Sequence, residues 1–341
     1  MLAAMALPAK ALIFYGSGDP EYNTTTPASE PNSGWELQGN WGVNLGTPIG
    51  PHHFITANHV GGAVGDPFYF RGVFYTTIST VHDSASDLQI WEVAGTFPAW
   101  AGLYNGLTET GADLMVYGRG MIRGTEVRIN GALKGWQWGA YDTRMRWGRN
   151  RVASISTTPN YPSSDVLVVK FDTNGGADEA HLAYGDSGGG LFIKDGTTWA
   201  LAGINFYVDG PYNTTSSGTG FNAAIFDEGG LYKKTAGNWV FTPDLPAAQP
   251  GGFAATRIKS RISWIQGVLA APLTPWPVTL VESTSAGGSF TQASDATWDS
   301  NAKTFRVPAP NGPAFFQIRG SASVTITGSR LENGTLVLSY Q

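Results

Sequence analysis

The chain has 341 residues, of which 42% are hydrophobic, 12% aromatic and 14% charged, and its formal net charge is −5. This negative balance disfavours binding to nucleic acids or anionic membranes, and the absence of cysteine excludes disulfides, thiolate metal sites and a cysteine nucleophile. The length suggests more than one domain, and abundant aromatic residues with few charges favour a β-rich fold.

Residues 1–11 form a short apolar segment ending in Ala9-Lys10-Ala11, the small-x-small pattern of a signal-peptidase cleavage site. The segment lacks a basic start, so an ordinary disordered N-terminus is an equal alternative to the remnant of a signal peptide. No stretch approaches the ~20 apolar residues of a membrane-spanning helix. We therefore expect no transmembrane segment, and the cleavage pattern favours a secreted or periplasmic protein.

Short runs of alternating apolar residues, bounded by Gly, Pro, Asn and Asp, recur through the first two thirds of the chain. They predict strands over Phe68–Tyr75, Leu88–Val93, Leu114–Tyr117, Val166–Phe171, Trp199–Phe206 and Gly220–Phe226. Such a series is typical of an all-β barrel or sandwich. One helical pattern follows Thr256, a suitable N-cap, with Ile258, Ile262, Ile265 and Leu269 on one face.

Residues 272–277, Pro-Leu-Thr-Pro-Trp-Pro, indicate a domain boundary after this helix. Beyond it, strands are predicted over Val278–Glu282, Thr304–Val307, Phe315–Ile318, Val324–Thr327 and Leu336–Tyr340. A module of roughly 65 residues is marginal alone, so we expect the small β-rich domain at 271–341 to pack on the main domain. It either attaches the protein to a surface or glycan, or serves as a stabilising or export-related appendix. The Gly- and Pro-containing stretch 229–252 is an insertion of open role.

The first motif suited to nucleophilic catalysis is Thr-Ala-Asn-His at residues 56–59. Its context distinguishes His59 from the other four histidines; His52 and His53, for example, follow a proline in a turn. The second motif is Asp-Leu-Gln-Ile, in which Asp87 opens an apolar strand. Asp83 lies nearby in a polar turn and is the less favoured alternative.

The third motif is Gly-Asp-Ser-Gly-Gly-Gly at residues 185–190, between two apolar segments. Glycines have no Cβ and permit both a strained turn and a close backbone approach to a substrate. A plain hairpin turn is the alternative interpretation, since the chain has 45 glycines. The order His59, Asp87, Ser187 separates this arrangement from the subtilisin order and from that of the α/β-hydrolases.

At these motifs the chain resembles the chymotrypsin/trypsin-like serine endopeptidases. Residues 56–59 resemble the family's Thr-Ala-Ala-His, 87–90 its Asp-Ile-Ala-Leu, and 185–190 its Gly-Asp-Ser-Gly-Gly-Pro. Two further stretches, 116–120 and 201–204, resemble the opening of the second barrel and the strand after the nucleophile. The resemblance covers residues 12–270, and segment 146–152 is most similar to secreted bacterial members. It implies two six-stranded antiparallel β-barrels with a C-terminal helix.

The resemblance implies that Ser187 is the nucleophile, His59 the general base and Asp87 the group that orients the imidazole. It places the oxyanion hole at the backbone N–H groups of Gly185 and Ser187. No Ile-Val-Gly-Gly terminus is present to pair with Asp186, which favours a preformed site. We expect no cofactor and no metal ion.

The residue six positions before the nucleophile, His181, is implied to lie at the base of the primary specificity pocket. The resemblance also implies walls formed by Asn205, Phe206, Tyr207 and Val208 on one side and by Gly220 on the other. Because His181 is not a carboxylate, we do not expect cleavage after Arg or Lys. Neutral side chains, and acidic ones recognised by a protonated His181, both remain open.

These observations predict a serine endopeptidase that acts on a polypeptide substrate through an acyl-enzyme. Two other classes remain as alternatives: a catalytically silent pseudoprotease that binds peptides, and an extracellular β-structured adhesion protein. The three ordered motifs favour the enzyme over both.

Overall fold

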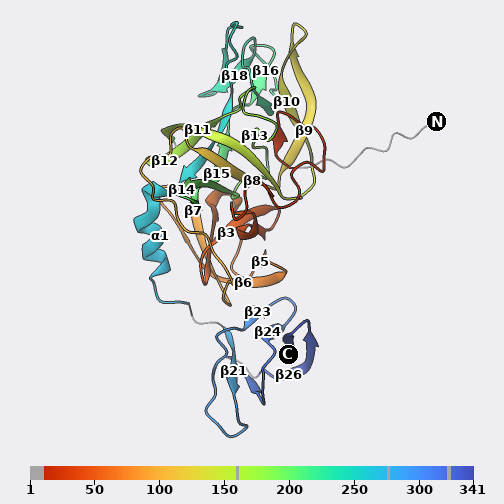
Figure 1. The fold of residues 1–341 in the computed structure, drawn as a ribbon, viewed down its shortest axis with the longest axis vertical. Coiled ribbons are helices and arrows are strands. Elements are labelled where there is room, and N and C mark those ends of the chain that lie inside the picture. The colour runs from red at the N-terminus through yellow and green to blue at the C-terminus, as the bar shows by residue number, and fades with distance from the viewer. Residues whose placement is uncertain (1–10, 159–160, 275–276, 321–323) are drawn as a thin grey trace, which may run out of the picture.

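Two closed, six-stranded antiparallel barrels dominate the computed structural model, which describes residues 11–158, 161–274, 277–320 and 324–341 (Figure 1). Each barrel buries its own apolar core, and a further apolar cluster joins residues of both barrels with residues of the helix. The predicted fold class is confirmed: two barrels, a helix after the second barrel, and an additional β module.

The first barrel is built from residues 39–93. Its strands, in spatial order, are β2 (Gly39–Trp41), β3 (Asn44–Gly50), β4 (His53–Ala57), β7 (Leu88–Val93), β6 (Val73–His82) and β5 (Pro67–Phe70). Alternation sets the inward face of β5, where Phe68 and Phe70 are fully buried and Tyr69 is exposed.

The single strand predicted over Phe68–Tyr75 is wrong. The chain reverses at Arg71 and Gly72, whose φ values are +47° and +84°, and β5 pairs with β6 across this two-residue turn. Positive φ at both central residues matches the right-handed twist of a tight hairpin.

The second barrel uses residues from both sides of the nucleophile motif. Its strands, in spatial order, are β11 (Arg146–Thr158), β12 (Tyr161–Lys170), β20 (Gly252–Arg257), β15 (Thr198–Val208), β14 (Gly190–Asp195) and β8 (Asp113–Gly118). A two-stranded sheet of β1 (Ile13–Phe14) and β13 (Ala180–His181) ties the N-terminal segment to this barrel.

Two long excursions from the second barrel meet in space at its end of the molecule (Figure 1). The first is the hairpin of β9 (Met121–Ile129) and β10 (Ala132–Tyr141); the second lies between β15 and β20 and contains β17 (Ala223–Ile225). β10 pairs with β17, so the two excursions share one sheet. The second also holds a separate sheet of β16 (Tyr212–Asn213), β18 (Tyr232–Thr235) and β19 (Asn238–Phe241).

The helix α1 spans Ile262–Leu269 and follows a 3-10 turn at Lys259–Arg261. The predicted N-cap, Thr256, lies instead in β20, where it pairs with Val166 and Ile204. The helix therefore begins later than predicted, because the barrel holds the chain extended as far as Arg257. Further 3-10 turns lie at Trp35–Leu37 and Asn58–Val60.

The C-terminal module consists of two small sheets below the first barrel in Figure 1. Their strands are β21 (Val278–Ser283), β22 (Thr291–Gln292), β23 (Thr297–Asp299), β24 (Thr304–Pro308), β25 (Phe315–Gly320), β26 (Ile326–Glu332) and β27 (Thr335–Tyr340). Ala94 of the main domain belongs to the module's apolar core, and Thr76 Oγ1 donates to Trp298 O at 2.8 Å.

The domain boundaries 12–270 and 271–341 stay a prediction. The predicted leader at 1–11 falls almost wholly outside the described residues, and the proline-dense boundary segment falls partly outside them.

Candidate active site

The two barrels each supply part of the candidate site. His59 lies in the 3-10 turn that follows β4, and Asp87 immediately precedes β7 of the same barrel. Ser187 lies in the turn between β13 and β14, with positive φ at Gly185 (+93°) and Gly188 (+81°). L side chains rarely adopt these angles, so the glycines of the motif are needed for the backbone path itself.

The side chains of His59, Asp87 and Ser187 form one continuous hydrogen-bonded chain. His59 Nε2 lies 2.8 Å from Ser187 Oγ, and His59 Nδ1 lies 2.6 Å from Asp87 Oδ2. The Asp87 side chain is 1% exposed, whereas the imidazole is 42% exposed. A buried acceptor therefore holds one ring nitrogen while the other faces the serine at the surface.

Asp83, the alternative acidic residue, is engaged elsewhere. Arg261 Nε lies 2.6 Å from Asp83 Oδ2, and Ser86 Oγ donates to the same oxygen at 2.6 Å. Asp83 thus ties the helical end of the domain to the first barrel, and the structure pairs Asp87 with His59.

The backbone N–H groups of Gly185 and Ser187 are the predicted oxyanion donors, and their surroundings in the turn are as follows. Met121 N, on β9, donates to Tyr184 O at 2.8 Å. Because the N–H and C=O of a trans peptide point in opposite directions, this bond turns the N–H of Gly185 away from β9. Among the described residues, neither Gly185 N nor Ser187 N has a hydrogen-bond acceptor.

The Asp186 side chain is buried beneath the nucleophile turn and is held by backbone hydrogen bonds. Its carboxylate accepts the backbone N–H groups of Gly120 and Ala183, each at 2.7 Å. Burial raises the pKa of Asp186 to about 7, while these bonds and the positive charge of Arg146 act in the opposite direction.

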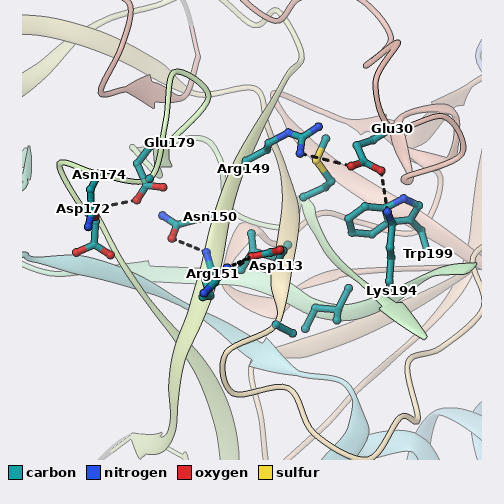
Figure 2. Close-up of a pocket in the computed structure, with 15 residues that line it drawn as sticks. Glu30, Asp113, Arg149, Asn150, Arg151, Asp172, Asn174, Glu179, Lys194 and Trp199 are labelled. Atoms are coloured by element: carbon teal, nitrogen blue, oxygen red, sulfur yellow. Dashed lines mark hydrogen bonds and ion pairs between the residues drawn. The ribbon is translucent and has the colours of Figure 1, made fainter. Parts of the chain in front are cut away.

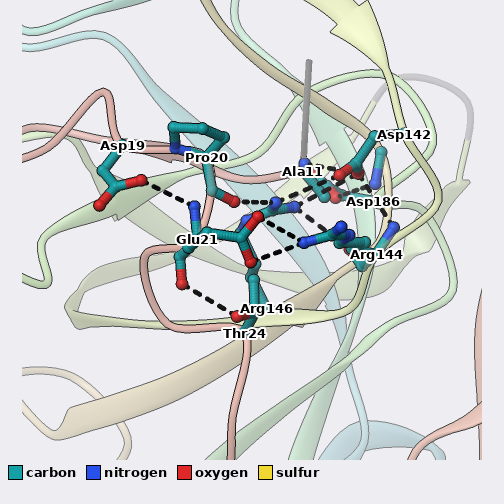
Figure 3. Close-up of polar contacts among 10 residues, drawn as sticks. Ala11, Asp19, Pro20, Glu21, Thr24, Asp142, Arg144, Arg146 and Asp186 are labelled. Carbon is teal, nitrogen blue, oxygen red and sulfur yellow. Dashed lines mark hydrogen bonds and ion pairs between the residues drawn. The ribbon is translucent and has the colours of Figure 1, made fainter. Parts of the chain in front are cut away.

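Arg146 connects this region to the N-terminal segment, as Figure 3 shows. Its guanidinium is 1% exposed, donates to Pro20 O at 2.6 Å and forms an ion pair with Asp142 at 3.2 Å. Ala11 N donates to the same Asp142 side chain at 3.2 Å. Residues 11–24 are thereby anchored beside the nucleophile turn.

A cavity of about 510 Å³ opens beside Ser187. Its lining residues come from both barrels and from the β9–β10 hairpin: Val43, Asn44, His59, Val60, Trp138, Leu182, Ala183, Tyr184, Gly185, Ser187, Phe206, Tyr207 and Val208. Apart from His59, the described lining residues carry no ionisable group other than tyrosine. Aliphatic and aromatic side chains therefore make up most of the lining, and its aromatic members are Trp138, Tyr184, Phe206 and Tyr207.

Three of the six predicted substrate-binding residues, Phe206, Tyr207 and Val208, line this cavity, and the other three do not. His181 is fully buried in β13, and its ring nitrogens lie 2.6 Å from Leu182 O and 3.0 Å from Gly252 O. Burial lowers its pKa. Because both nitrogens face backbone carbonyls inside the second barrel, His181 offers no polar atom to a substrate side chain.

Asn205 and Gly220 are displaced from the cavity for different reasons. Asn205 is fully buried, and its amide donates to Tyr117 O and Asp186 O. Gly220 lies in the long excursion between β15 and β20, where it packs against Tyr212 and Trp239. The strand that pairs with the end of β15 is β20, so residue 220 does not lie opposite that end.

Sequence reasoning missed Tyr184 and Trp138. Tyr184 directly precedes the Gly-Asp-Ser motif, and that adjacency was a usable signal. Trp138 lies on the β9–β10 hairpin, outside the three catalytic motifs, and no local pattern pointed to it.

A second cavity, of about 700 Å³, lies elsewhere on the second barrel and is lined by none of the residues of the three catalytic motifs (Figure 2). It is lined by paired charges, including Arg151 with Asp113 at 2.8 Å and Lys194 with Glu30 at 3.0 Å. Glu179 is buried in its wall, and burial raises the pKa of this carboxyl to about 8.

Within the described ranges, no three His, Asp or Glu side chains gather in a way that would hold a metal ion. The same part of the chain contains no helix that is long and apolar enough to span a membrane.

A scan against models of known protein families finds no match, and a search of curated proteins finds none either. Among solved structures, the chain is similar to neuropsin, described as a serine protease expressed in the limbic system of mouse brain. The two are 15% identical with a TM-score of 0.42, over 72% of this chain and 98% of neuropsin. The two-barrel assignment rests on the strand pairing described above.

Proposed function

We propose that this protein is a serine endopeptidase that hydrolyses peptide bonds through His59, Asp87 and Ser187. One observation carries the proposal: the His59 imidazole bridges Ser187 Oγ at 2.8 Å and Asp87 Oδ2 at 2.6 Å. A serine hydroxyl is a weak nucleophile by itself and needs a base within hydrogen-bond reach, which is itself oriented by a third group.

In the proposed reaction, Ser187 Oγ attacks the carbonyl carbon of the scissile bond while His59 Nε2 accepts the hydroxyl proton. Asp87 holds the Nδ1–H tautomer and stabilises the imidazolium that forms. The N–H groups of Gly185 and Ser187 stabilise the oxyanion, each donor contributing about 3 kcal/mol.

His59 then delivers its proton to the leaving amine, which leaves an acyl-enzyme on Ser187. Water, deprotonated by the same imidazole, attacks the acyl carbonyl and releases the peptide acid. The serine proton thus leaves with the amine in the first half-reaction, and in the second His59 delivers the proton taken from water to Ser187 Oγ. One water molecule is consumed for each bond cleaved, and the enzyme returns to its starting state.

The neutral cavity beside Ser187 supports a preference for neutral side chains on the acyl side of the scissile bond. A buried guanidinium or ammonium without a partner carries a desolvation penalty of several kcal/mol. The cavity's described lining holds no carboxylate to offset it. Export to the cell exterior or periplasm, and the similarity to secreted bacterial members, are parts of the same proposal that rest on sequence patterns alone.

The test is active-site labelling with a fluorophosphonate probe, followed by peptide mapping and hydrolysis of a general protein substrate. We expect labelling at Ser187 and complete loss of labelling and turnover in Ser187→Ala, with unchanged circular dichroism. Ser216→Ala, which alters an exposed serine, is the matched control and should behave as wild type. Unlabelled wild type, or turnover that survives Ser187→Ala, would contradict the proposal and favour a peptide-binding or adhesive protein.

A further inference from the structure

Side-chain amides hold three consecutive backbone carbonyls of the nucleophile turn. Asn44 Nδ2 donates to Gly185 O and to Ser187 O, each at 3.2 Å. Asn205 Nδ2 donates to the carbonyl between them, Asp186 O, at 3.0 Å. Each peptide that follows Gly185, Asp186 and Ser187 therefore has a fixed orientation.

The two asparagines approach the turn from different barrels. Asn44 begins β3 of the first barrel, is half-buried and lines the cavity beside Ser187. It thereby joins the barrel that carries His59 to the turn that carries the serine. Its backbone makes the β3–β2 pairing with Trp41, so the position of its side chain is set by the barrel.

Asn205 holds the turn from within the second barrel. It is fully buried, and its Nδ2 donates to Tyr117 O at 2.8 Å as well as to Asp186 O. Its backbone also contributes, because Asn205 N donates to Gly189 O at 2.9 Å and Gly188 N donates to Asn205 O at 3.1 Å. The pairing of β15 with β20 shifts register between Asn205 and Tyr207, where the strand leaves regular geometry.

The peptide between Asp186 and Ser187 contains both the carbonyl that Asn205 binds and the N–H of Ser187, a proposed oxyanion donor. A trans peptide is planar, and its C=O and N–H point in opposite directions. Because Asn205 binds the Asp186 carbonyl, the Ser187 N–H must point away from the barrel interior. Asn44 binds the carbonyls of the two donor residues themselves, Gly185 and Ser187, and so fixes the peptide that follows each donor N–H. At Gly185 this restrains a backbone rotation that glycine otherwise permits at little cost.

We propose that Asn44 and Asn205 are positioning residues that orient the oxyanion donors of Gly185 and Ser187. This inference rests on the proposed function. Neither side chain touches the reacting atoms; each acts through the backbone of the turn. Loss of either asparagine side chain leaves the two N–H donors in place but free to rotate. Binding of the uncleaved substrate is then retained, and stabilisation of the transition state is reduced.

The expected effect is a fall in kcat with little change in KM. Removal of one oxyanion donor outright lowers kcat by about 10²- to 10³-fold. Misorientation is a smaller perturbation, so we expect Asn44→Ala and Asn205→Ser each to lower kcat by about 10- to 100-fold. KM should stay within about threefold of wild type, because the rest of the cavity is intact.

The experiment compares Asn44→Ala, Asn205→Ser and the control Asn238→Ala, which changes an exposed asparagine of the β18–β19 hairpin. For each we would measure kcat, KM, the affinity for a peptidyl boronic acid with phenylalanine at its reactive end, and the crystal structure. A boronate bound to Ser187 mimics the tetrahedral anion, so its affinity should fall by the same factor as kcat/KM. The control should match wild type in every measurement.

Values of kcat and boronate affinity within twofold of wild type in both variants would overturn the inference, as would a loss confined to KM. Asn44→Ala alone decides the kinetic question if Asn205→Ser does not fold. If wild type neither hydrolyses peptides nor reacts with the fluorophosphonate, the proposed function fails first. The crystal structures then decide the positioning role: rotated peptides at residues 184–187 support it, and unchanged peptides overturn it.

Discussion

Asp87 holds His59 at two points: its Oδ2 lies 2.6 Å from the imidazole Nδ1, and its Oδ1 accepts the His59 backbone N–H at 3.1 Å. Asn58 N, one residue earlier, donates to the Asp87 carbonyl at 2.9 Å. The aspartate therefore fixes both the ring and the 3-10 turn that carries it. Substituting it alters tautomer choice and local backbone order together.

Asp87→Asn tests the tautomer role. If the amide oxygen accepts the His59 backbone N–H, the amide N–H₂ faces Nδ1, which must then carry the lone pair. The ring proton moves to Nε2, the wrong nitrogen for a base that accepts the Ser187 proton. A loss of about 10⁴-fold in kcat is expected. Steady-state kinetics on a peptide substrate measure it, and Asp83→Asn is the control. A loss below tenfold in Asp87→Asn would contradict the assignment.

The cavity composition predicts the cleavage profile. Neutral side chains should dominate the acyl-side position, because the described lining holds no carboxylate and both His181 ring nitrogens face backbone carbonyls away from the cavity. A peptide-library digest read by mass spectrometry measures the profile. Dominance of Arg and Lys, or of Asp and Glu, would contradict this prediction.

Trp138, on the β9–β10 hairpin, lines the cavity and should contribute to the choice of substrate side chain. Trp138→Ala enlarges the cavity and should change the ratio of kcat/KM between small and aromatic substrates by about tenfold or more. Trp239→Ala, which alters a tryptophan outside the cavity, should leave the ratio unchanged.

Arg146→Met tests the anchor beside the nucleophile turn. The substitution leaves Asp142 buried without its cation and Pro20 O without its donor. Breaking a buried ion pair at one partner costs about 3 kcal/mol or more in the free energy of unfolding. Urea denaturation measures it. In Arg144→Met, which removes an exposed ion pair with Glu21, the change should stay below about 1 kcal/mol.

The raised pKa of the buried Glu179 carboxyl predicts that the free energy of unfolding depends on pH. Burial raises its pKa from 4.5 to about 8 in the folded protein. Between these values the folded state keeps a proton that the unfolded chain has lost, so rising pH lowers the free energy of unfolding. Glu179→Gln cannot ionise, and its amide oxygen can still accept the Asp172 N–H that Glu179 Oε1 now accepts at 2.9 Å.

The stability of Glu179→Gln relative to wild type should therefore rise from pH 5 to pH 8, by at most about 1.4 kcal/mol per pH unit. Urea denaturation at both pH values measures it. Glu126→Gln, at an exposed side chain, should track wild type. A relative stability that is flat or falls with pH would rule out a buried neutral Glu179.

Alternation in the sequence by itself predicted an all-β barrel or sandwich, and the local motifs around His59, Asp87 and Ser187 carried the family resemblance that implied two barrels. These features are local: alternation sets which face of a strand is buried, and glycines permit the positive φ values that the nucleophile turn requires. Local alternation does not report a chain reversal made by two residues, so it missed the turn at Arg71 and Gly72.

Only the tertiary structure decided what surrounds the serine. Phe206, Tyr207 and Val208, at the end of β15, line the cavity. His181, Asn205 and Gly220 do not. The excursion between β15 and β20 carries Gly220 away, and Trp138 reaches the cavity from another excursion. Asn44 meets the nucleophile turn across the barrel interface, about 140 residues away in the chain. Contacts of this kind depend on long-range packing, which no local pattern encodes.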